Sequence, residues 1–504
     1  MKEAVVFYPA PLIGHLVSTI ELCKFILTHQ PSLSIHILIT IAPYDTSSTS
    51  NYISTVSTTL PSITFHTLPT FTPPQTLLSS SLNHETLLFH VLHHNNPHIH
   101  QTLLSLSQTH TLHALIVDIL SSQSISVASQ LNLPCYLFVP ASASLLAAFL
   151  YHSTLHETYH KSFKDLNNTF LNIPGVPPMP ARDMPKPLLE RNDEVYKNFL
   201  SCSLAAPKAA GLIVNTFEAL EPSSTKAICD GLCLPNSPTS PLYCLGPLVT
   251  TTEQNQNNSS DHECLRWLDL QPSKSVVFLC FGSLGVFSRE QLCEIAIGLE
   301  KSEQRFLWVV RNPVSDQKHN LALGTQEDPD LEFLLPKGFL DRTKEKGLVV
   351  KNWVPQAAVL SHDSVGGFVS HCGWNSVLEA VCAGVPMIAW PLYAEQRFNR
   401  VVLVEEMKVA LWMHESAESG FVAAIEVEKR VRELMESERG ERVRNRVRVA
   451  KDEAKAATRE GGSSRVALDK LLKSWKERDK VMSDQSHMQC KLLPSSFLFG
   501  KYEN

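Results

Sequence analysis

The sequence predicts an α/β protein made of two Rossmann-like domains, and three observations support this prediction. The chain has 504 residues, too many for one ordinary domain and enough for two. Short apolar segments alternate with helical patterns in two successive series, which is typical of parallel sheets covered by helices. A polar segment rich in Thr, Asn, Gln and Ser, residues 249–262, separates the two series and is the expected linker.

The first series predicts an N-terminal domain over residues 1–248. Its strands are apolar along their length, so both faces of the sheet should be buried. They are expected at 4–8, 35–41, 63–68, 114–118, 135–139 and 212–215. From Phe25 to His160 the chain has no Lys or Arg, yet this stretch holds 14 of the 21 histidines. This asymmetry in charge indicates that the two halves do different work.

The second series predicts a C-terminal domain over residues 263–460. Its strands are expected at 276–281, 306–310, 348–351, 366–370 and 387–390. A charge-rich helix should cover 426–460 and end at Gly461 and Gly462. A last helix, 461–476, capped by Ser463 or Ser464, is expected to pack back on the N-terminal domain. Residues 477–504 lose the pattern and are predicted to form a disordered tail.

Composition excludes several classes of protein. An apolar share of 43% and a charged share of 19% exclude a disordered chain, a collagen and a coiled coil. The net charge of −6 argues against a nucleic-acid partner. No apolar run is long enough for stable membrane insertion, and the N-terminus lacks the pattern of a signal peptide. The 12 scattered cysteines fit reduced thiols, so we expect a cytoplasmic protein.

Two patterns suggest metal ligands, and neither predicts a metal site. Six histidines lie between His84 and His100, but Glu85 is the only acidic residue among them, which favours a polar helix face or pocket wall. Asp328 and Asp330 form an Asp-x-Asp, but in a polar loop away from the strand ends where a ligand is expected. We therefore expect no metal.

The segment 353–396 predicts a nucleotide pocket. Its middle reads as a strand (GGFVS), a tight turn (HCGWNS) and a helix (VLEAV). The backbone N–H groups from Gly373 to Ser376 open this helix at the carboxyl edge of the sheet, where the helix dipole favours an anion. His371 and the Ser376 hydroxyl can add donors to a diphosphate.

Other polar side chains of the segment should meet at the same edge. Glu379 lies one helical turn after Ser376 and can accept from ribose hydroxyls. Trp353 offers a flat face to a base, and Gln356 can bond the edge of that base. Glu395 and Gln396 follow a strand and can bind sugar hydroxyls. The alternative is that the three tryptophans of this segment, Trp353, Trp374 and Trp390, are core aromatics, because a single tryptophan is more often buried in a core than in contact with a ligand.

In length, order and nearly every residue, this segment resembles the signature box of plant family-1 UDP-sugar-dependent glycosyltransferases. The resemblance extends from Gly14 and His15 to the helix ending near Trp475. It implies the GT-B fold, in which two Rossmann-like β/α/β domains face each other across a cleft and the C-terminal one binds the UDP-sugar. The residues that it implies for that binding are Ser283, Trp353, Val354, Gln356, His371, Gly373, Trp374, Asn375, Ser376, Glu379, Tyr393, Glu395 and Gln396.

The resemblance also indicates the sugar. A terminal Gln, here Gln396, goes with glucose in this family, and relatives that use UDP-glucuronate carry Arg where this chain has Trp374. Both features favour UDP-glucose, as a co-substrate and with no cofactor. Glu395 stands where many members have Asp, which could shift the sugar contacts.

His15 and Asp118 are the candidate catalytic residues. His15 follows the first strand and its turn, and Asp118 ends the strand ALIVD, so both should lie at the carboxyl edge of the first sheet. A neutral His suits deprotonation of an acceptor hydroxyl, and a carboxylate on its other nitrogen fixes the tautomer. The alternative for a lone His is a structural role, but the resemblance implies a His–Asp dyad at these positions. We expect inverting, metal-independent transfer.

The acceptor should bind in the N-terminal half. Its low charge favours a flat, apolar, hydroxylated molecule, because an unpaired buried charge is costly. The chain resembles flavonoid and isoflavonoid 7-O-glucosyltransferases, which implies a small phenolic acceptor. Other acceptors, such as a chalcone, terpenoid or hormone, and C-glucosylation remain alternatives. The expected pocket wall, chosen from strand ends and loops, is Leu12, Phe89, Ser142, Leu145 and Met184.

The sequence argues against two other classes of protein. A dinucleotide oxidoreductase would show G-x-G-x-x-G after a strand, and no predicted strand is followed by one. A non-catalytic sugar-nucleotide binding protein would keep the 353–396 segment and lose the dyad, but both dyad residues are present. The enzyme is expected to act as a monomer.

Overall fold

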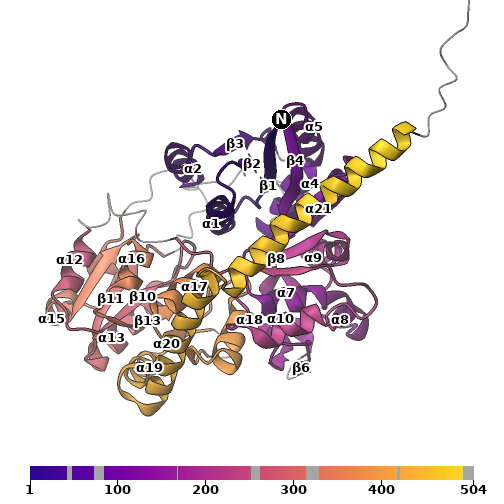
Figure 1. Cartoon of the computed structure of the whole chain (residues 1–504). Coiled ribbons are helices and arrows are strands. Elements are labelled where there is room, and N and C mark those ends of the chain that lie inside the picture. The colour runs from indigo at the N-terminus through magenta and orange to yellow at the C-terminus, as the bar shows by residue number, and fades with distance from the viewer. Residues whose placement is uncertain are drawn as a thin grey trace, which may run out of the picture.

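The computed structural model describes residues 1–41, 48–72, 84–166, 169–250, 262–313, 328–416 and 420–491. Figure 1 shows two α/β domains, the first coloured from indigo to magenta and the second from salmon to yellow. A seven-stranded sheet forms the centre of the first domain and a six-stranded sheet the centre of the second. The predicted two Rossmann-like domains are confirmed.

The N-terminal sheet is parallel throughout. Its strands follow one another across the sheet as β3 (Ile63–Thr67), β2 (Ser34–Ile39), β1 (Lys2–Tyr8), β4 (His110–Asp118), β5 (Cys135–Val139), β8 (Gly211–Val214) and β9 (Leu242–Cys244). All six predicted strands are present. The short edge strand β9 was not predicted.

Alternating side chains of the central strand β1 pack on opposite faces of this sheet. Val6 and Tyr8 belong to a cluster that also contains Leu88 and Leu146, from helices α4 (His84–His94) and α7 (Ala143–Leu150). Val5 and Phe7 belong to a second cluster with residues of α1 (Ile13–His29) and α21 (Ser463–Lys491). Burial on both faces explains why the strand is apolar along its length.

The C-terminal sheet is also parallel. Its order is β12 (Gly347–Lys351), β11 (Arg305–Val310), β10 (Val276–Cys280), β13 (Val365–Ser370), β14 (Met387–Ala389) and β15 (Ala410–Trp412). The five predicted strands are confirmed, and β15 is an additional three-residue edge strand. The strand order starts at β10 and runs outward in both directions, so the carboxyl ends of β10 and β13 form the switch point where ligands bind in such sheets.

The charge-rich stretch predicted as one helix over 426–460 is two helices, α19 (Ala424–Glu436) and α20 (Glu438–Thr458). Ser437 separates them, and its Oγ accepts from the backbone N–H of Gly440 at 3.0 Å as the N-cap of α20. The last helix, α21, runs on to Lys491, past the boundary predicted at Lys476. Residues 492–504 of the predicted tail and 251–261 of the predicted linker lie outside the described residues.

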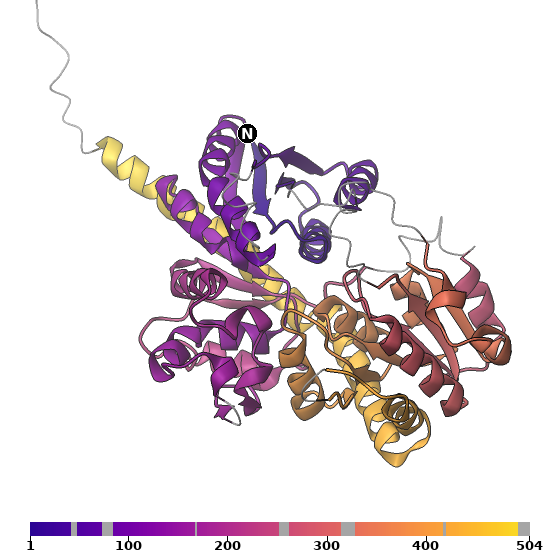
Figure 2. The same cartoon turned by 180° about the vertical axis from the view of Figure 1, so that it is seen from behind.

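Helix α21 leaves the second domain and lies along the first, as Figures 1 and 2 both show. Leu468, Leu471 and Trp475 are buried in the N-terminal core. The ring of Trp475 stacks on His113 with 6.3 Å between centroids, and the Ser474 hydroxyl bonds the Tyr136 hydroxyl at 2.9 Å. The C-terminal helix is therefore part of the N-terminal domain.

Candidate active site

His15 and Asp118 meet at the carboxyl edge of the N-terminal sheet. His15 is in the first turn of α1, just after β1, and Asp118 ends the neighbouring strand β4. His15 Nδ1 lies 2.6 Å from Asp118 Oδ2. The other carboxylate oxygen accepts from the backbone N–H of Leu120 at 2.9 Å, which fixes the carboxylate. His15 Nε2 is therefore the ring nitrogen left for a substrate.

The surroundings of His15 favour its protonated form. Burial by itself lowers the pKa of His15, but the charge and hydrogen bond of Asp118, helped by the charge of Glu395, outweigh burial and raise the pKa above its usual value. Asp118 is on the first domain and Glu395 on the second. An imidazolium formed at this position is thus stabilised by carboxylates from both domains.

The turn between β13 and helix α17 (Trp374–Ala383) closely surrounds the imidazole of His371. A Cβ on Gly282 would lie 2.5 Å from His371 Nε2, and a Cβ on Gly373 would lie 2.4 Å from it, so glycine is required at both positions. Burial, and then the charge of Arg311, lower the pKa of His371 to about 4. His371 is therefore neutral near pH 7, and its buried Nδ1 has no partner among the described residues.

A hydrogen-bonded cluster lies beside this turn. Gln356 Nε2 donates to the Ser376 hydroxyl at 2.9 Å and to Glu379 Oε2 at 2.7 Å. Burial raises the pKa of Glu379 to about 7, against the lowering effect of the Gln356 hydrogen bond. Trp353, three residues before Gln356, is 63% exposed, so its face is open to a ligand, whereas its neighbour Val354 is buried. Gln356, Ser376 and Glu379 therefore lie together as expected from the sequence, whereas the ring of Trp353 lies 6.0 Å from that of His262.

The turn before helix α18 (Gln396–Val401) is held by its own glutamine. Gln396 Oε1 accepts from the backbone N–H groups of Leu392 at 2.8 Å and Tyr393 at 2.9 Å. Its carbonyl oxygen is therefore occupied within the turn. The ring of Tyr393 lies 6.0 Å from that of His371, which brings this turn to the β13–α17 turn.

Hydrogen bonds between the domains connect the dyad to the first turn of α17. Asn375 Nδ2 donates to the carbonyl of Gly14, the residue before His15, at 3.1 Å. The Ser18 hydroxyl donates to Asn375 Oδ1 at 2.9 Å. The indole N–H of Trp374 donates to the carbonyl of Asn215 at 2.7 Å, and Trp374 is buried. In this structure Trp374 is an interdomain contact rather than an open ligand surface.

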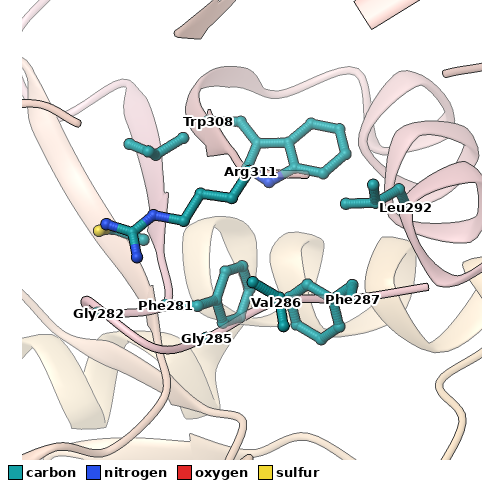
Figure 3. A pocket seen from close by; sticks show the side chains of 10 residues that line it. Phe281, Gly282, Gly285, Val286, Phe287, Leu292, Trp308 and Arg311 are labelled. Atoms are coloured by element: carbon teal, nitrogen blue, oxygen red, sulfur yellow. The ribbon is translucent and has the colours of Figure 1, made fainter. Parts of the chain in front are cut away.

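Arg311 is a site residue that the sequence analysis missed. It follows β11 directly, at the carboxyl edge of the sheet, and lines a pocket with Phe281, Gly282 and Gly285 (Figure 3). Its guanidinium donates to the carbonyl of Ser283. The available signal was its position after a predicted strand, but Arg311 lies outside the 353–396 segment that predicts the nucleotide pocket.

The five residues expected to form the acceptor wall differ in exposure. Leu12 and Leu145 are half-buried against the N-terminal core. Phe89, Ser142 and Met184 are each 1% exposed. Phe89 packs edge-on against Phe199, with 5.3 Å between ring centroids, and Ser142 Oγ accepts from the Leu145 N–H as the N-cap of α7. Their role at an acceptor stays a prediction.

The described residues contain no group of three or more His, Cys, Asp and Glu side chains placed to hold a metal ion. Asp330 instead caps the short helix α14 (Leu331–Leu334), and Asp328 accepts from Asn352 Nδ2 at 2.7 Å. Within the described ranges, no helix has both the length and the apolar character needed to cross a membrane.

Comparison with known sequences identifies relatives over almost the whole chain. Residues 241–439 match the family model described as UDP-glucoronosyl and UDP-glucosyl transferase. The chain is 52% identical to UDP-glycosyltransferase 88B1 of Stevia rebaudiana, over 94% of this chain and 99% of that protein. It is 48% identical to anthocyanidin 5,3-O-glucosyltransferase of a Rosa hybrid cultivar, over 94% of this chain and 99% of that protein. It is 46% identical to isoflavone 7-O-glucosyltransferase 1 of Glycine max, over 95% of this chain and all of that protein.

Solved structures agree with this assignment. Phytolacca americana UGT2, complexed with UDP-2fluoro-glucose and pterostilbene, superposes with a TM-score of 0.82 at 36% identity, over 94% of this chain and all of that one. The apo structure of the same protein gives a TM-score of 0.83. The two parallel-sheet domains described above are therefore the two halves of a GT-B fold. The chain belongs to the UDP-glycosyltransferase family and is an enzyme that transfers a sugar from a UDP-sugar to a small-molecule acceptor.

Proposed function

We propose that this enzyme transfers glucose from UDP-glucose to a phenolic hydroxyl of a flavonoid or isoflavonoid, at the 7-position, with inversion and without a metal ion. The observation that carries the proposal is the contact between the dyad and the donor turn. Gly14, next to His15, accepts from Asn375 in the first turn of α17. A base and an anion-binding helix N-terminus are thus held together across the two domains.

In the proposed reaction His15 Nε2 accepts the proton of the acceptor hydroxyl. The acceptor oxygen then forms a bond to the anomeric carbon, and the bond from that carbon to the UDP oxygen breaks. The proton stays on His15 while Asp118 stabilises the imidazolium, as the raised pKa of His15 supports. UDP leaves with the electron pair of the broken bond. Attack opposite the leaving group inverts the configuration at that carbon.

We assign the donor contacts to the C-terminal edge. Trp353 stacks on the base and Gln356 bonds its edge, whereas Glu379 accepts from the ribose hydroxyls. Ser283, His371, Asn375 and Ser376 hold the diphosphate, whose growing charge is met by fixed N–H dipoles. Glu395 and Gln396 bind glucose. The exposure of Trp353 and the unpartnered Nδ1 of His371 support these assignments.

The acceptor class is supported by the low charge of the N-terminal half and by the relatives. Among them are an anthocyanidin 5,3-O-glucosyltransferase and an isoflavone 7-O-glucosyltransferase, and UGT2 was solved with pterostilbene. These names agree on phenolic acceptors and differ on the hydroxyl. The 7-position is therefore the finer part of the proposal, and the assay must resolve position.

The test is incubation of the enzyme with UDP-glucose and a mixture of flavones, isoflavones, chalcones and terpenoids, followed by mass spectrometry and NMR of the products. We expect a β-linked 7-O-glucoside of a flavone or isoflavone, removed by acid hydrolysis. Terpenoid glucosides alone, or an acid-stable C-glucoside, would overturn the acceptor or linkage. Hydrolysis of UDP-glucose with no glucoside from any acceptor would contradict the assigned transfer.

Metal independence has a separate test. The enzyme is dialysed against EDTA and assayed with and without added Mg²⁺ or Mn²⁺. We expect the same turnover in all samples. Loss of activity with EDTA that Mn²⁺ restores would refute this part of the proposal and leave the acceptor assignment standing.

A further inference from the structure

We propose that Arg311 is a donor-positioning residue: it joins the turn that carries Ser283 to the loop that carries Trp353 and places a positive charge beside the diphosphate of the UDP-sugar. The inference rests on the proposed donor site and adds to it a residue outside the 353–396 segment. That segment contains neither Lys nor Arg.

The sheet order gives Arg311 its central place. Strand β11 lies between β10 and β12, and Arg311 is the first residue after β11. On one side the chain leaves β10 into the turn with Gly282 and Ser283. On the other side it leaves β12 into the loop with Asn352 and Trp353. A side chain at the end of the middle strand can therefore reach both segments.

Arg311 bonds both of them. Its Nη1 donates to the carbonyl of Ser283, and its Nε donates to the carbonyl of Asn352 at 3.1 Å. Asn352 has a φ of +61°, a left-handed conformation that is uncommon for a residue other than glycine. The side-chain Nδ2 of Asn352 donates a hydrogen bond to Asp328 Oδ1 at 2.7 Å. These contacts fix the backbone at the residue that precedes Trp353.

The guanidinium also has unused hydrogen-bonding capacity. Figure 3 shows the Arg311 side chain extending along the pocket, with its guanidinium on the side of Gly282. No described residue is bonded to Nη2, whose two N–H groups are suited to phosphate oxygens. Arg311 also helps to lower the pKa of His371 to about 4, after burial, so its positive charge is felt at the β13–α17 turn.

The charge matters because the neighbouring imidazole does not supply one. With a pKa of about 4, His371 is neutral at pH 7 and offers only a hydrogen bond. Helix N-termini contribute partial charges, whereas a diphosphate carries full negative charges. Arg311 supplies a full positive charge at the edge where the helix dipole already points. Lysine would keep this charge but could not bridge two carbonyls in the same planar geometry.

The test compares Arg311→Gln and Arg311→Lys with a matched control, Arg305→Gln. Arg305 is at the other end of the same strand and donates to Gln271 Oε1 at 3.0 Å. Titration calorimetry measures the affinity for UDP, UMP and uridine, and kinetics give KM for UDP-glucose and for the acceptor. For Arg311→Gln we expect at least about a tenfold loss of UDP affinity, a smaller loss for uridine and an unchanged acceptor KM. Arg311→Lys should recover part of the loss for UDP.

Three outcomes would overturn the proposal. The first is that Arg311→Gln changes UDP affinity no more than Arg305→Gln does. The second is equal weakening of UDP and uridine, which would show that no charge acts on the diphosphate. The third is that Arg311→Lys behaves like Arg311→Gln for UDP. Trp353→Ala, measured in parallel, distinguishes failure of this inference from failure of the proposed donor site. If Trp353→Ala also leaves UDP affinity unchanged, the donor site itself is wrong. If Arg311→Gln does not fold, Arg311→Lys still tests the proposal. Its affinities for UDP and for uridine are then compared with those of the wild type, and equal weakening of both would overturn the proposal.

Discussion

Asp183 and Arg400 form an ion pair between the two domains, with 3.3 Å between Oδ1 and Nη2 and only 3% of each side chain exposed. Arg400 also donates to Glu415 at 2.7 Å, and its guanidinium lies 3.9 Å from the centre of the Trp412 ring. Arg400 is in α18, which begins with Gln396. A buried charged network therefore fixes α18 against the first domain.

This network predicts unequal effects of removing its members. Arg400→Met leaves buried carboxylates without their main partner, so it should lower the free energy of unfolding by about 3–5 kcal/mol. Asp183→Asn leaves Arg400 paired with Glu415 and should cost less. Thermal unfolding of both variants is the measurement. As a control, Lys226→Ala removes the exposed pair with Asp230, which solvent screens, and should change the free energy of unfolding much less than Arg400→Met does. Equal losses for the buried and exposed pairs would contradict the prediction.

The dyad predicts a large loss of turnover without a loss of fold. His15→Ala should lower kcat by about 10²- to 10⁴-fold, because it removes the base that we propose for the acceptor proton. His29→Gln, at the other end of the same helix, should leave kcat unchanged. Steady-state rates and melting temperatures of both variants provide the check. Near-wild-type turnover in His15→Ala would exclude His15 as the base.

The raised pKa of His15 predicts the acid side of the pH–rate profile. The base must be neutral, so kcat/KM should fall as pH drops through the pKa of His15, which Asp118 and Glu395 hold above 6.5 against burial. In Asp118→Asn the remaining activity should show this inflection at lower pH. A wild-type inflection below 6.5, or one that Asp118→Asn leaves in place, would show that another group titrates.

The proposed contact of Glu379 with the ribose predicts that its effect on UDP affinity depends on the 2′-hydroxyl. If its carboxylate accepts from the ribose 2′-hydroxyl, Glu379→Ala should weaken UDP about tenfold and weaken 2′-deoxy-UDP much less. Calorimetry with both ligands and both proteins gives the coupling between the side chain and the hydroxyl. Additive effects would place Glu379 away from that hydroxyl.

A cluster of histidines predicts that stability falls in acid. His36 Nδ1 lies 2.9 Å from His66 Nε2, and the rings of His36 and His110 are 4.7 Å apart. Burial, followed by the charges of His66 and His110, lowers the pKa of His36 to about 4. The unfolded chain therefore binds more protons between about pH 4 and 6.5, and stability drops as pH falls through this range. At pH 5 His36 alone should cost about 2 kcal/mol relative to pH 7.5.

Melting temperatures at pH 7.5 and pH 5 test this cluster. From pH 7.5 to pH 5, the melting temperature of His36→Gln should fall by less than that of the wild type does. His160→Gln, which changes an exposed histidine, should decrease as the wild type does. Identical decreases in all three proteins would show that the cluster does not control acid stability.

The sequence was sufficient for the fold because buried parallel strands are marked by uninterrupted apolar runs. It missed β9 and β15, which have three residues each and lie at sheet edges, where a short run resembles a loop. It also joined α19 and α20 into one helix. The break is at Ser437, which has an extended backbone and caps α20, and the surrounding charged pattern does not indicate it.

The candidate site was predictable where its residues are neighbours in the sequence and much less where they are not. Gln356, Ser376 and Glu379 lie within one short segment, and they form one cluster. Arg311 lies outside that segment and reaches it only because β11 is between β10 and β12. Exposure of the expected acceptor wall depends on long-range packing, such as Phe89 against Phe199, that no local pattern encodes.

The return of α21 to the first domain has a mechanical consequence. In the order of the described elements, the polypeptide passes from the first domain to the second between β9 and α12 (Glu263–Asp269) and returns between α20 and α21. Because Leu468, Leu471 and Trp475 of α21 are buried in the N-terminal core, the second domain is tied to the first at the end of α20 as well as through the linker. The two halves of the site, which meet where Asn375 donates to the carbonyl of Gly14, are therefore joined by two covalent connections rather than one.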